Sequence, residues 1–141
     1  ISNGRTQHQK PWPSAMQFAI RHSMKLYNFR TLNRMILPEV YMDFYKNCMR
    51  KMPDKLIGID LSDGKTNFYS DAIELLDENS ITNFLAEDDF VFMIHQGYIF
   101  WYFKADGNSN PTVYGFQEGK PKPDILGSLS DFIAEVSNHG V

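Results

Sequence analysis

One stretch of sequence decides how this chain folds: Asp89-Phe-Val-Phe-Met-Ile-His-Gln-Gly-Tyr-Ile-Phe-Trp-Tyr-Phe-Lys104. It holds two apolar, aromatic-rich runs that only Gln96 and Gly97 separate. Aromatic and β-branched residues favour extended backbone, and glycine readily adopts the positive φ that a tight reversal needs. The stretch is therefore predicted to form a β-hairpin that turns at Gln96-Gly97.

Both faces of this hairpin are apolar. A two-residue turn would place Phe90, Phe92 and Ile94 opposite Phe103, Trp101 and Ile99 on one face, and Val91, Met93 and His95 opposite Tyr102, Phe100 and Tyr98 on the other. A hairpin with one solvated face would alternate apolar with polar residues, and this one does not. We therefore expect helices on one face and a loop, a helix or a partner on the other.

Periodicity places the remaining elements around the hairpin. Residues 1–13 are predicted to be a flexible arm, and residues 14–141 a single domain. Helical spacing begins at Ser14. A second helix is predicted with Pro38 as its first residue, and its apolar side carries Val40, Tyr41, Phe44, Tyr45 and Cys48. After it, the pattern predicts a strand over 56–61, a turn over 62–65 that leads into a second strand over 66–69, and a helix over 72–78 capped by Ser70 or Asp71.

Periodicity also predicts the elements of the C-terminal part. A strand is predicted over 112–118, a loop over 119–124, and a last helix from Ser128 or Ser130 to Val136, burying Leu129, Phe132, Ile133 and Val136. Helices at both ends of a mostly antiparallel sheet predict the α+β class.

Charge is divided unevenly along the chain. Residues 1–55 carry ten Lys/Arg and three acids, whereas residues 56–141 carry four Lys/Arg and fourteen acids. This polarity either steers a charged partner or reflects a basic helical half packed beside an acidic sheet half. The single cysteine, the missing signal-peptide pattern and the missing apolar run of about 20 residues lead us to expect a cytoplasmic protein with no membrane contact.

Motifs for catalysis or for cofactor and metal binding are weak. The stretch from Gly58 to Thr66 resembles a phosphate-binding loop, but five residues instead of four separate its glycines. The stretch from Asp106 onward resembles a calcium loop but has Pro111 where glycine belongs and Gln117 where the bidentate Glu belongs. We therefore expect no cofactor, no metal and no enzyme.

Aromatic side chains suggest a binding surface. Tyr98, Phe100 and Tyr102, with Tyr114 and Phe116 on the next strand, would form an aromatic sheet face, unless all of them are core. Nucleic-acid-binding sheets interleave such rings with Lys/Arg, and this half is acidic, so nucleic-acid binding is disfavoured. An acidic, aromatic surface is better suited to a basic protein.

The order of several motifs resembles the SUKH superfamily of cell-wall-assembly regulators and bacterial immunity proteins. Leu37-Pro38-Glu39-Val-Tyr41-Met-Asp-Phe44 resembles its "LP-x-x-Y-x-x-F" opening, and residues 90–98 resemble its central hairpin. Pro111-Thr-Val113-Tyr114 is similar to its "P-x-V-Y" strand, and residues 128–133 to its closing helix, with Leu129 replacing a Phe. The Asn-Gly-Gly turn that members often have is absent, since Cys48-Met49-Arg50 follows Asn47.

The resemblance implies a non-enzymatic α+β protein-binding module, most simply an immunity protein that neutralises a nuclease-like toxin. A scaffold of the cell-wall-regulator type is the alternative, and a small hydrolase or ligand-binding enzyme using His95 is a third possibility. The sequence leaves the oligomeric state open. The residues predicted to contact a basic partner are Glu87, Asp88, Asp89, His95, Tyr98, Asp106 and Tyr114.

Overall fold

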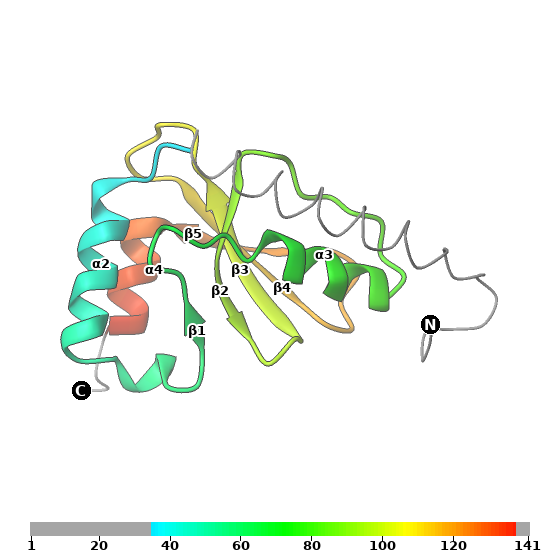
Figure 1. Cartoon of the computed structure of the whole chain (residues 1–141), viewed down its shortest axis with the longest axis horizontal. Coiled ribbons are helices and arrows are strands. Elements are labelled where there is room, and N and C mark those ends of the chain that lie inside the picture. Colours follow the sequence, from blue (N-terminus) through cyan, green and yellow to red (C-terminus); the bar gives the residue numbers. More distant parts are fainter. Residues whose placement is uncertain (1–34, 138–141) are drawn as a thin grey trace.

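The computed structural model describes residues 35–137, which form an α+β domain (Figure 1). The predicted arm over 1–13 and the helix from Ser14 lie outside the described residues. The elements are α2 (Glu39–Arg50), the short 3-10 helix η1 (Asp54–Leu56), β1 (Asp60–Leu61), α3 (Tyr69–Glu78), β2 (Asp89–His95), β3 (Ile99–Lys104), β4 (Thr112–Gln117), β5 (Asp124–Ser128) and α4 (Leu129–Ser137).

The strands form one five-stranded antiparallel sheet in the order β1-β2-β3-β4-β5. Each strand thus pairs with its neighbour in the sequence, and the aromatic hairpin β2–β3 lies at the centre. The predicted fold class, with a helix before the sheet and a helix after it, is confirmed.

The hairpin turns where predicted, but its register differs. Gln96 and Gly97 both have positive φ, 47° and 81°, as a type I′ turn requires. Phe90 pairs with Phe103 as expected, and then a β-bulge between Val91 and Met93 shifts the register. The predicted partners of the last three β2 residues are therefore wrong: Met93 pairs with Trp101, Ile94 with Phe100, and His95 with Ile99.

The bulge has a packing reason. An extra residue in one strand of an antiparallel pair breaks the strict alternation of side chains between the two faces. Phe92 and Met93 consequently both belong to one apolar cluster, while Ile94 belongs to the cluster on the other face. Strict alternation would have placed Met93 and Ile94 the other way round.

Both faces of the sheet are covered, as predicted. On one face, α2 and α4 lie side by side and bury Phe90, Phe92 and Phe103 (Figure 1). On the other face, α3 and the loop that follows it bury Phe100 and Phe116, among others.

Helix α2 follows the Leu37-Pro38 signal closely. Pro38 is not the predicted first helical residue but the N-cap: it is extended, with φ −67° and ψ 145°, and helix α2 begins at Glu39. Its missing N–H therefore removes no helical hydrogen bond. Tyr41, Phe44 and Cys48 recur at helical spacing and are buried against the sheet. Tyr41 is fully buried, and its hydroxyl donates to the carbonyl of Ser62.

The segment between α2 and α3 differs from the prediction. The strand predicted over 56–61 is reduced to Asp60–Leu61, and 66–69 is not a strand. Instead, the buried side chain of Asn67 accepts the Val91 N–H at 3.0 Å and donates to the Asp89 carbonyl at 3.4 Å. A side-chain amide thus satisfies backbone groups at the outer edge of β2, where a strand would otherwise pair.

Two other boundaries also differ. Helix α3 begins at Tyr69, so Ser70 and Asp71 lie within its first turn and neither caps it. The loop predicted to lead directly into the last helix instead reaches a fifth strand, Asp124–Ser128. This strand is short and mostly exposed, so it lacks the buried alternation that identifies a strand in a sequence.

Candidate functional site

The seven residues predicted to contact a partner do not form one surface. Glu87, Asp88 and Asp89 lie at the start of β2, and Asp106 lies nearby, because the Ala105 N–H donates to the Asp88 carbonyl at 2.8 Å. His95 and Tyr98 lie at the opposite end of the hairpin, about 20 Å away at the usual rise of a strand. Tyr114 lies on β4, on the face that α3 covers.

The acidic end of the hairpin carries its own counter-ion. Lys104 Nζ lies 3.0 Å from Asp88 Oδ1 and 3.2 Å from Asp89 Oδ1. Asp89 is 4% exposed, and its second oxygen accepts the Ala86 N–H at 2.8 Å. Burial raises the pKa of Asp89, although the Ala86 N–H and Lys104 act in the opposite direction. These contacts hold the start of β2 in place, and the single charge of Lys104 balances one of the two carboxylates, while Glu87 and Asp106 stay exposed.

Replacing Lys104 with methionine tests this structural role. An acid whose pKa is higher in the folded than in the unfolded chain destabilises the fold above its folded pKa, and the penalty fades as pH falls through that pKa. Without Lys104 the pKa of Asp89 rises further. We expect Lys104→Met to lower the free energy of unfolding by about 1 kcal/mol at pH 7 and by progressively less towards pH 4. Urea denaturation across this pH range measures the difference.

The control is Lys120→Met, which breaks an exposed pair between Lys120 and Asp124 at 2.9 Å. Both of these side chains are about half exposed, so this variant is expected to match the unaltered chain within about 0.5 kcal/mol at every pH. A loss in Lys104→Met that does not change with pH would contradict the role assigned to Asp89.

His95 and Tyr98 form a small aromatic pair at the hairpin turn. Their ring centroids lie 5.4 Å apart, edge to face, and His95 Nδ1 lies 3.1 Å from the Gly58 carbonyl oxygen. Tyr98 is 42% exposed and donates its hydroxyl to the Gln96 side chain at 3.0 Å. The His95 ring is thus positioned by backbone near the turn, and it does not line the groove described below.

The predicted aromatic face is mostly core. Phe100 and Phe116 are fully buried and Tyr102 is 6% exposed, under Phe84 and α3. Tyr114 is half-buried and stacks on Tyr102, with ring centroids 5.2 Å apart. Only the outer part of this face is therefore open to a partner.

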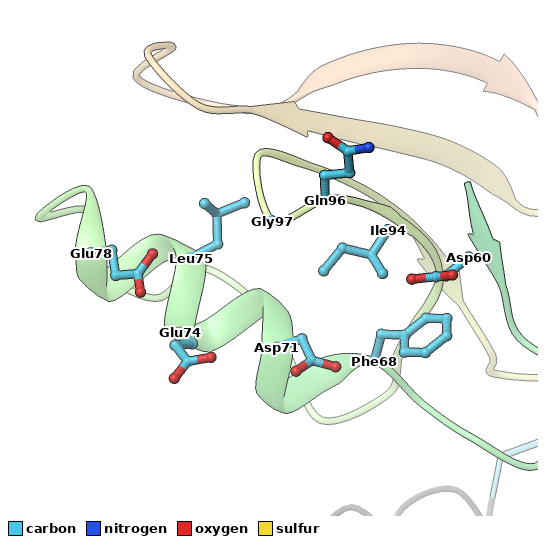
Figure 2. Close-up of a pocket in the computed structure, with 9 residues that line it drawn as sticks. All are labelled: Asp60, Phe68, Asp71, Glu74, Leu75, Glu78, Ile94, Gln96 and Gly97. Atoms are coloured by element: carbon cyan, nitrogen blue, oxygen red, sulfur yellow. The ribbon is translucent and has the colours of Figure 1, made fainter. Parts of the chain in front are cut away.

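A groove between α3 and the hairpin turn gathers several acidic side chains. It has a volume of about 350 Å³, and among residues 35–137 its lining includes four carboxylates and no Lys, Arg or His. Figure 2 shows Asp71, Glu74 and Glu78 following one another along α3, with the Gln96-Gly97 turn facing the helix. Asp60 of β1 joins them from the sheet edge. A second hollow, of about 480 Å³ on α2, is lined by one acid, two basic residues and an amide: Asp43, Lys46, Arg50 and Asn47.

The carboxylates of α3 repel one another. Asp71 and Glu74 are three residues apart and Glu74 and Glu78 four apart, which makes them neighbours on one side of the helix. Burial, and then the charge of Asp60, raise the pKa of Asp71. Glu78 also lies in the last turn, where the helix dipole disfavours an acid. The helix therefore carries this charge at the expense of its own stability.

Sequence reasoning missed this groove. The 3-4 spacing of Asp71, Glu74 and Glu78 was visible, but the predicted helix began after Asp71 and so did not place the three acids together. Asp60 lies far from them in the sequence, and only the pairing of β1 with β2 brings it to the same place.

Within residues 35–137, no group of three or more His, Cys, Asp or Glu side chains is arranged to hold a metal ion. None of the helices in this part of the chain is long and apolar enough to cross a membrane.

Comparison of the chain with models of known families, with curated proteins and with solved structures finds no match. The resemblance to the SUKH superfamily therefore stays a prediction from sequence motifs.

Proposed function

We propose that this domain is a non-enzymatic protein-binding module whose acidic α3 groove takes a basic protein partner. One observation carries the proposal: a surface helix holds like charges in adjacent turns and faces a groove that no Lys, Arg or His in the described part of the chain lines. Residues that act against local stability are typical of functional sites. A partner rich in Lys and Arg would relieve the repulsion when it binds, and acidic potential would steer its approach.

Within this class we propose an immunity protein that neutralises a basic, nuclease-like toxin in the cytoplasm. The ordered motif resemblance supports this choice, as does the excess of acids after residue 56. Nucleases carry basic surfaces because they bind phosphates, so an acidic module can occupy the same surface. The groove residues and the exposed Tyr98 at the adjoining turn would be the contacts, since tyrosine is a favoured interface anchor.

The test is a pull-down from native lysate, together with the product of the neighbouring gene, at low and high salt. We expect capture of a basic protein whose association weakens as salt screens the charges. Adding the domain to that protein should then suppress its nuclease activity. Failure to capture any basic protein, the neighbouring product included, would contradict the proposal and favour a scaffold role.

A further inference from the structure

Strand β5 (Asp124–Ser128) forms an open edge of the sheet. It is the last strand in the sheet order and pairs with β4 on one side. Among residues 35–137, no strand pairs with its other side. The outward N–H and C=O groups of an edge strand are a template for pairing with another strand.

The side chains of this edge are apolar on both faces. Ile125 is 72% exposed and lies opposite Tyr114, on the α3 side of the sheet. Leu126 is 39% exposed and packs over Gly115 beside Trp101, on the other side. Gly115 leaves room for the side chains of Leu126 and Trp101, since a Cβ added at position 115 would lie 3.0 Å from Leu126 Cδ1.

The usual protection of an edge strand is weak here. Natural edges carry lysines, inward-pointing charges or prolines that block further pairing. Within β5 the only charge is Asp124, and Lys120 neutralises it at 2.9 Å. Pro123 and the positive φ of Gly127, 95°, limit the length of the strand, but Ile125 and Leu126 between them stay open.

Charge distribution favours a second copy of this chain as the occupant. Residues 35–137 contain all 17 acids of the chain but only 8 of its 14 Lys/Arg, so two copies repel each other over most of this surface. The segment 119–128 is an exception, because it holds Lys120 and Lys122 against the single Asp124. Contact between two copies there brings no acid against acid.

We propose that two copies associate through antiparallel pairing of their β5 strands, about a two-fold axis near Ile125 and Leu126. Antiparallel pairing places residues before β5 in one copy next to residues after β5 in the other. Lys122 of each copy then lies near Asp131 in the first turn of α4 of the second copy. In the described part of one chain, neither residue has an ion-pair partner within 4.0 Å, so two symmetric ion pairs can form.

The dimer is weak and concentration-dependent. Five residues a side bury less than the roughly 1,000 Å² that stable interfaces exceed. The pairing joins two five-stranded sheets into one continuous sheet. It uses the edge opposite β1, at the far end of the sheet order from Asp60, and is therefore independent of the proposed function.

Sedimentation velocity of the full chain, over about a hundredfold range of concentration, tests the proposal. We expect the mass to rise from one copy to two across the range. Ile125→Lys places a charge on the open edge and is expected to weaken the dimer at least about 10-fold. Lys122→Glu is expected to weaken it as well, and more at low salt than at high salt.

The matched control is Ile57→Lys, which changes an isoleucine of nearly equal exposure, 68%, outside the sheet. This variant should dimerise as the unaltered chain does. A single copy at every concentration would overturn the proposal, and so would a dimer that Ile125→Lys leaves intact. If the chain stays single while hydrogen exchange shows protection of the β5 amides that point away from β4, another segment of the same chain covers β5 and the proposal is wrong.

Discussion

Reversing the charge of the α3 groove, by changing Asp71, Glu74 and Glu78 together to lysine, is expected to weaken binding of the captured basic partner about 100-fold at low salt. Each reversal replaces attraction by repulsion at an exposed position and costs about 1 kcal/mol, so that three give about 3 kcal/mol. The effect should shrink at high salt, where screening weakens the attraction and the repulsion alike. Titration calorimetry at two salt concentrations measures both.

The control keeps the change in net charge and moves it to the other side of the sheet. Asp43, Asp54 and Glu135 are exposed acids of α2, η1 and α4, remote from the groove. Their replacement by lysine is expected to slow association modestly and to change affinity less than about 10-fold, since long-range steering affects the on-rate. Equal loss in the two variants would show that net charge, and not the groove, determines binding. In that case the domain would still bind a basic protein, but the assignment of the α3 groove as its binding site would be wrong.

Replacing Tyr41 with alanine is expected to lower the free energy of unfolding by about 4 kcal/mol, the largest loss we expect from one substitution in the described part of the chain. Its ring is fully buried and contacts Phe90, Phe92 and Phe103, each with ring centroids 5.6 Å away. Removing it leaves a cavity between α2 and the central hairpin. A domain of this size has about 5–15 kcal/mol in total, so much of its stability would be lost. Chemical denaturation followed by circular dichroism measures the change.

Two further variants keep this prediction testable if the alanine variant does not fold. Burial raises the pKa of Tyr41 far above its ordinary value, so the hydroxyl stays protonated and donates to the Ser62 carbonyl. Tyr41→Phe removes only this hydrogen bond and should cost about 1 kcal/mol. Tyr45→Ala, on the same helix but half-buried, should cost less than Tyr41→Ala. Equal losses at positions 41 and 45 would refute the assignment of Tyr41 to the centre of the core.

The parts of the fold that were predicted correctly depend on neighbours in the sequence. The turn at Gln96-Gly97 follows from the conformational freedom of one glycine between two apolar runs. Helix α2 follows from Pro38 and from apolar residues at helical spacing. The coverage of both sheet faces follows from the absence of alternation in the hairpin.

The parts that were wrong or missed depend on residues distant in the sequence. The hairpin register shifts because α2 and α4 accommodate Phe92 and Met93 together, and no local rule places that bulge. The strand predicted over 66–69 fails because the Asn67 amide meets backbone groups of β2. Strand β5 was missed because its stability comes from pairing with β4 and not from its own pattern.

The candidate site also combines features that depend on sequence neighbours with features that depend on residues distant in the sequence. Composition and periodicity are local properties, and they were enough to predict an acidic second half, an aromatic hairpin at its centre and the α+β class. Which acids have a cation beside them depends on tertiary packing. Lys104 forms ion pairs with both Asp88 and Asp89, and its charge balances one of them, whereas β1 brings Asp60 to the acids of α3, where no Lys, Arg or His among residues 35–137 lines the groove. The sequence gives the number of charges, but which charges pair depends on the folded structure, because Coulomb interactions depend on distance and burial and not on sequence order.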